Sequence, residues 1–135
     1  MRRLIDDPTC RLRVFLWLVA LHSLGVGVML IALPPSVMAS FGYATVTERF
    51  FQVQGGVFHF VMVVAYVMAA RDLRGGDPLV VFAITVKFMA TVFLVVYWLA
   101  VDPILVVLLS GLGDGAMAVL LWWLYAQHRR VTGAA

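Results

Sequence analysis

Apolar residues run along this chain in four long stretches, separated by short segments that hold most of the prolines and charges. The stretches cover residues 14–33, 50–70, 79–101 and 103–126. Each one reaches or exceeds the length of about 20 predominantly apolar residues that a helix needs to cross the hydrocarbon core of a bilayer. The pattern therefore predicts an all-α fold with four transmembrane helices.

The boundaries of the stretches carry helix start and stop signals. Pro34 ends the first stretch, because proline lacks an amide donor and disfavours helical geometry in the residue before it. Asp77-Pro78 and Asp102-Pro103 have the form of a helix start, with a capping carboxylate followed by proline in the first turn. The longest connection, residues 34–49, is expected to be a polar loop. Short connections make neighbouring helices antiparallel, so we expect one domain, residues 1–135, folded as an antiparallel bundle.

Composition supports lipid as the solvent of this fold. Hydrophobic residues make up 64% of the chain and charged residues 13%, and the mean hydropathy is +1.02. This leaves too little polar surface to cover a water-soluble domain. The net charge of +3 does not indicate a nucleic-acid partner, because the basic residues gather at helix ends. Cys10 is the single cysteine, which excludes an internal disulfide and a cysteine-cluster metal site.

Arginines gather on one side of the predicted bundle. The opposite side carries only Arg49, whereas eight others flank the stretches on the side of the chain ends: Arg2, Arg3, Arg11, Arg13, Arg71, Arg74, Arg129 and Arg130. The last two are expected to follow the fourth helix, and the first four to precede the first helix. By the positive-inside rule, both termini and the 71–77 connection are predicted to be cytoplasmic.

Every predicted helix carries one strongly polar residue near its middle: His22, His59, Lys87 and Asp114, in chain order. At about 1.5 Å per helical residue, all four fall in one layer near the bilayer midplane. A charge there costs on the order of 2.5–3.5 kcal/mol, which lipid cannot offset. We therefore expect an inward-facing polar cluster, with Lys87 and Asp114 as mutual partners.

Two further polar residues share a helical stripe with His59, namely Gln52 and Tyr66. The candidate ligand-binding or proton-relay residues are therefore His22, His59, Lys87, Asp114, Gln52 and Tyr66. The same pattern also fits a purely structural pair that fixes helix register. No catalytic residue follows from the sequence, and we expect no independent catalytic activity.

Haem is a further alternative, because His22 and His59 lie at similar depth and paired imidazoles can ligate iron in a helical bundle. The lysine–aspartate pair would compete for the same space, which makes haem a poor fit. No other metal site is expected.

The chain resembles the DoxX-like family of small bacterial four-helix membrane proteins over nearly its whole length. The resemblance rests on the first helix with its terminal proline (residues 22–34), Gly55-Gly56, the segment 69–72, Lys87 and Asp114. It implies a bacterial inner membrane location. For named members of the family it implies an association with quinone-linked oxidation of sulfur compounds or with oxidative-stress complexes. A quinone is therefore a possible ligand.

These observations leave three functional hypotheses. The first is a membrane protein that binds a small lipophilic molecule, a quinone or lipid, at the midplane cluster. The second is a non-catalytic subunit of a larger membrane complex, and the third is a small transporter in which Asp114 carries the coupled proton. The bilayer is the expected environment, with a membrane protein or a second copy of the chain as possible partner.

Overall fold

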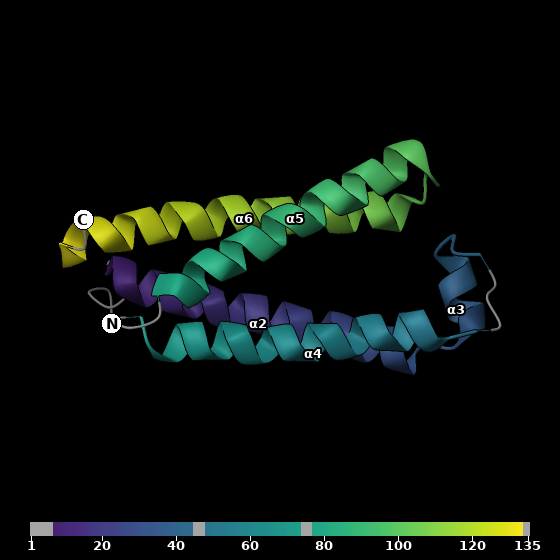
Figure 1. Cartoon of the computed structure of the whole chain (residues 1–135), viewed down its shortest axis with the longest axis horizontal. Helices are drawn as coiled ribbons and strands as arrows, with labels where there is room; N and C mark the ends of the chain where they lie inside the picture. Colours follow the sequence, from purple (N-terminus) through teal and green to yellow (C-terminus); the bar gives the residue numbers. More distant parts are fainter. Residues whose placement is uncertain (1–6, 45–47, 74–76, 134–135) are drawn as a thin grey trace.

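The computed structural model describes residues 7–44, 48–73 and 77–133, and that part of the chain forms four long helices and one short one (Figure 1). The long helices are α2 (Pro8–Ala32), α4 (Phe50–Arg71), α5 (Asp77–Ala100) and α6 (Leu105–Thr132). Each is long and apolar enough to cross a membrane. The prediction of an all-α, four-span membrane protein is therefore confirmed.

Helix α2 begins at Pro8 rather than at residue 14. The carboxylate of Asp7 accepts a hydrogen bond from the Thr9 amide (3.1 Å), and proline occupies the first turn, where its missing amide donor costs nothing. Asp7 and Pro8 therefore start the helix before the apolar stretch begins. Arg11 and Arg13 consequently lie on the helix and not in a tail before it, whereas Arg2, Arg3 and Arg74 lie outside the described residues.

Helix α6 is shifted toward the C-terminus relative to the predicted 103–126. Asp102 and Pro103 do not start the helix, because the Ile104 amide bonds the Asp102 carbonyl in a tight turn and Leu105 is the first helical residue. The helix ends at Thr132, where Gly133 adopts a left-handed φ of 68°. Arg129 and Arg130 therefore belong to the last turn, where cations interact favourably with the helix dipole.

Two antiparallel hairpins, α2 with α4 and α5 with α6, make up the molecule. In the first hairpin the backbones approach closely at Gly27 and Gly56. A Cβ atom added to Gly56 would lie 2.8 Å from the Gly27 carbonyl oxygen and 2.6 Å from Cγ1 of Ile31. Small residues thus permit the backbone contact, as is common between helices in membranes.

The two hairpins meet at the end of the molecule where α2 begins and α6 ends, and they diverge toward the other end (Figure 1). The shared core is apolar and includes Leu12, Leu16, Val19, Ala20, Tyr66, Ala69, Ala70, Leu73, Val80, Ala83, Leu121, Leu124 and Tyr125. Side-chain hydrogen bonds join the first turns of α2 to the end of α6, from Thr9 to His128 (3.0 Å) and from Arg11 to Gln127 (2.9 Å). Both of these helix ends therefore lie on one side of the bundle.

A short helix, α3 (Pro35–Ser40), occupies part of the connection that was expected to be a loop. The segment after it reaches toward the turn between α5 and α6, since a Cβ atom at Gly42 would lie 3.4 Å from Cγ2 of Ile104. Burial, and to a smaller extent the nearby Tyr97, raises the pKa of Tyr43 above its ordinary value. The segment that follows α3 thus links the diverging ends of the two hairpins.

The close approach of α2 and α4 gives a first test. Gly56→Ala is expected to destabilise the protein by about 1–3 kcal/mol, because the new methyl group meets a backbone carbonyl that cannot move independently. Gly25→Ala is the matched control, since nothing lies within 4 Å of its added Cβ and alanine favours a helix. Thermal unfolding in mild detergent measures both. Equal stability of the two variants would contradict the close approach of Gly56 to the Gly27 carbonyl.

Candidate functional site

Lys87 of α5 and Asp114 of α6 form an ion pair in the middle of the bundle, with Nζ and Oδ1 2.5 Å apart. Both residues are buried, with 2% and 8% of their surfaces exposed. The pairing predicted from the sequence is therefore confirmed. A pair of this kind persists in an apolar environment because each charge offsets the desolvation of the other.

Helical spacing and small neighbours bring the two charges together. Asp114 lies on the buried stripe of α6 with Gly111 and Ala118, and a Cβ atom at Gly111 would lie 3.1 Å from Cβ of Leu94 on α5. One turn along, a Cβ at Gly115 would lie 3.1 Å from Cγ2 of Thr91. The glycines therefore hold α5 and α6 close enough for the lysine to reach the carboxylate.

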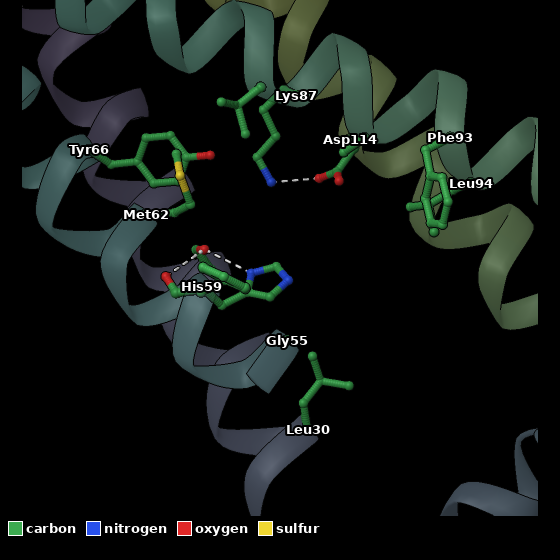
Figure 2. Close-up of a pocket in the computed structure, with 13 residues that line it drawn as sticks. Leu30, Gly55, His59, Met62, Tyr66, Lys87, Phe93, Leu94 and Asp114 are labelled. Carbon is green, nitrogen blue, oxygen red and sulfur yellow. Dashed lines mark hydrogen bonds and ion pairs between the residues drawn. The ribbon is translucent and has the colours of Figure 1, made fainter. Parts of the chain in front are cut away.

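The opposite hairpin presents neutral polar groups to this pair. Ser23 of α2 is buried, and its Oγ lies 3.0 Å from Nδ1 of His59 and 3.3 Å from the His59 carbonyl oxygen. Both contacts are satisfied when Nδ1–H donates to the serine oxygen and the serine hydroxyl donates to the carbonyl. The remaining ring nitrogen, Nε2, then presents a lone pair. Figure 2 shows this nitrogen on the side of the His59 ring away from the nitrogen that carries the hydrogen bond.

A cavity of about 340 Å³ lies between the two hairpins and is bordered by these polar groups. Its lining is Ser23, Leu30, Gly55, Phe58, His59, Met62, Tyr66, Val86, Lys87, Ala90, Phe93, Leu94 and Asp114. We call it the inter-hairpin cavity. Lys87 and Asp114 border it from the α5/α6 hairpin, while His59 and Tyr66 border it from α4 (Figure 2). The walls are otherwise apolar, so the cavity combines one polar region with a hydrophobic remainder.

Tyr66 marks the closed end of the inter-hairpin cavity. It is almost completely buried in the shared core, and its ring lies 5.9 Å from Nζ of Lys87, within the range of a cation–π contact. Phe58 and Phe93 lie at the other extreme, with 61% and 65% of their surfaces exposed. The lining therefore combines buried polar residues with an exposed aromatic rim, to which α4 contributes Phe58 and α5 contributes Phe93.

His22 does not occupy the expected position. It is exposed and is not among the residues that line the inter-hairpin cavity. Ser23, the next residue, instead continues the buried stripe of Leu16, Val19 and Gly27 on α2. The expectation that every helix contributes its ionisable residue to one inward cluster is therefore wrong for α2. The helical period through Leu16 and Val19 was the signal that could have identified Ser23.

Gln52 also has a different position from the other candidates. Its side-chain amide donates to the Leu30 carbonyl (2.8 Å), and Arg49 donates to the carbonyls of Ile31 (3.0 Å) and Leu33 (2.9 Å). Leu30 and Ile31 belong to the last turn of α2 and Leu33 is its C-cap, so these carbonyls have no partner within that helix. Gln52 thus satisfies a helix end and lines a separate cavity of about 320 Å³ beside α3.

The positions of the two histidines also bear on haem. His59 lines the inter-hairpin cavity and is held by Ser23, whereas His22 does not line it, so the cavity does not present the proposed pair of imidazole ligands. No group of three or more His, Cys, Asp or Glu residues suited to a metal ion occurs in the described part of the chain.

No family model, curated protein or solved structure matches this chain.

A double-mutant cycle tests the ion pair. Lys87→Met or Asp114→Leu alone is expected to lower the free energy of unfolding by about 3–5 kcal/mol, because each leaves an unpaired buried charge. The double variant is expected to recover most of this loss, since neither charge remains. Unfolding in mild detergent gives all three values. Additive losses in the double variant would show that the two residues do not depend on each other.

Proposed function

We propose that this integral membrane protein binds a small lipophilic molecule with a polar head, a quinone or lipid, in the inter-hairpin cavity. The observation that carries the proposal is the composition of the cavity: about 340 Å³ of space with apolar walls and one group of polar side chains at its buried end. Ligand sites commonly have this character, with a mainly hydrophobic lining and a few polar groups that orient the ligand.

The polar end offers both donors and an acceptor to a ligand head. The ammonium of Lys87 has three N–H donors, of which Asp114 takes one. Nε2 of His59 is the matching acceptor on the other wall when Nδ1 donates to Ser23. A carbonyl oxygen would be bound by the lysine, and a hydroxyl group could bridge to the imidazole. These are the functional groups of quinones, quinols and glycerolipids.

Access from the bilayer follows from the position of the rim. Phe58 and Phe93 border the cavity and are exposed on the outer surfaces of α4 and α5, which face lipid in a membrane. A ligand dissolved in the bilayer would therefore enter between these helices without passing through water. A hydrophobic tail would remain at the aromatic rim while the head reaches Lys87.

The resemblance to the DoxX-like family also favours a quinone as the ligand. We propose that the chain is a member of that family and lies in the bacterial inner membrane. A structural ion pair alone does not require a cavity beside it, because apolar side chains could fill the space between the hairpins. Retention of one defined lipophile would distinguish this proposal from a complex subunit or a transporter.

Blocking the cavity tests the proposal. The protein purified in mild detergent is expected to release a bound lipophile on solvent extraction, detected by mass spectrometry and by its absorption spectrum. Ala90→Phe adds a ring to the cavity lining. It is expected to reduce the amount of lipophile bound per protein by about tenfold or more, because an overfilled pocket excludes its ligand.

Ala116→Phe is the matched control, because this residue is exposed on α6 and does not line the cavity. It is expected to retain the lipophile. An equal loss in both variants, or no defined lipophile in the unmodified protein, would overturn the proposal.

We further propose that the end of the bundle formed by the start of α2 and the end of α6 faces the cytoplasm, following the arginine distribution. A green fluorescent protein fused after residue 135 is then expected to fluoresce, and alkaline phosphatase fused at the same point is expected to be inactive. The opposite pair of results would reverse the orientation.

A further inference from the structure

A second cavity lies at the end of the bundle where α2 begins and α6 ends. Its volume is about 430 Å³, and its lining comes from α2, α4, α6 and the residues beside them: Asp7, Thr9, Arg13, Arg71, Asp72, Leu73, His128 and Thr132. We call it the terminal cavity. Unlike the inter-hairpin cavity, it is bordered mainly by charged and hydroxyl side chains.

Two guanidinium groups border the terminal cavity without a partner. Neither Arg13 nor Arg71 makes a hydrogen bond or ion pair with another residue of the described chain. His128 is 4% exposed, and its Nδ1 is bonded to the Thr9 hydroxyl, which leaves Nε2 as the ring nitrogen available to a ligand. Arginine side chains bind phosphate groups through paired, charge-assisted hydrogen bonds.

The depth of the terminal cavity matches the headgroup layer of a bilayer. The helical rise of about 1.5 Å per residue places His128 about 21 Å from Asp114 along α6, and Arg71 about 18 Å from His59 along α4. Half of the hydrocarbon core is about 15 Å thick, and the headgroup region extends to about 20–22 Å from the midplane. With the ion pair at the midplane, the cavity lies among the lipid phosphates.

We propose that the terminal cavity binds the phosphate group of a phospholipid headgroup, with Arg13 and Arg71 as its cationic contacts. His128 adds one polar contact, and Leu73, which is buried, supplies an apolar wall. The carboxylate of Asp7 also borders the cavity and opposes additional negative charge. A zwitterionic headgroup that carries an ammonium next to its phosphate therefore fits better than an anionic one.

Lipid titration followed by native mass spectrometry tests this site. The full chain in non-ionic detergent is titrated with dihexanoyl phosphatidylethanolamine or dihexanoyl phosphatidylglycerol. We expect a single lipid adduct, formed at lower concentration with the ethanolamine lipid. Arg13→Gln and Arg71→Gln are each expected to weaken it about tenfold, as for the loss of a charge-assisted hydrogen bond to phosphate.

Arg130→Gln is the matched control, because this arginine is exposed at the same end and does not line the cavity. It is expected to change binding by less than about twofold, as for an exposed charge. Equal weakening in all three variants would show general attraction to basic residues and overturn the proposal. Undiminished binding in the first two would do the same.

Inorganic phosphate separates the two sources of a phosphate group. It is expected to compete with the lipid only weakly, because it lacks the ammonium and the acyl chains. Binding of inorganic phosphate without binding of either lipid would overturn the assignment to a phospholipid. Arg13→Gln and Arg71→Gln should keep the lipophile of the inter-hairpin cavity, so failure of one proposal is distinguishable from failure of the other.

Discussion

Opposite charges in the apolar part of a bilayer must be paired, and this structure is arranged around the pairing of Lys87 with Asp114. Each charge alone would cost on the order of 2.5–3.5 kcal/mol at the membrane centre. The pairing requires α5 and α6 to lie close together, which the glycines at 111 and 115 permit. The close packing of α5 against α6 is thus the arrangement that the ion pair requires.

Because both charges belong to one hairpin, the other hairpin does not have to close over them. It is held instead by the apolar core at the end of the bundle where α2 begins, and by the segment that follows α3 at the other end. Between these two contacts the hairpins diverge, and the inter-hairpin cavity occupies that position (Figure 1). Strong pairing within each hairpin and limited contact between them explain how so small a protein can contain a cavity.

The hydropathy pattern was sufficient to predict four helices, because a membrane span must be long and apolar regardless of its neighbours. The ion pair was also predictable, since each of its members lacked any other partner of opposite charge at that depth. The helix ends were harder to predict. Asp7 caps the start of α2 and Gly133 caps the end of α6, and both caps lie beyond the apolar stretches. His22 does not face the cavity because the buried stripe of α2 passes through Ser23, so helical phase and not ionisable character decides which residue of α2 faces inward. The role of Gln52 depends on a contact between two helices that no local pattern reveals.

The distribution of charge over the two walls of the inter-hairpin cavity has a mechanical consequence. A change in the angle between the hairpins would leave the Lys87–Asp114 distance unaltered, because both residues move with the same hairpin. The facing wall contributes the hydrogen-bonding groups of Ser23 and His59 and the ring of Tyr66, and no Asp, Glu, Lys or Arg of α2 or α4 lines the cavity. Widening the cavity to admit a ligand therefore separates no opposite charges across it, and the main cost is the cation–π contact and some apolar packing. A cavity built in this way can open to lipid without exposing an unpaired charge, which an ion pair divided between the hairpins could not do.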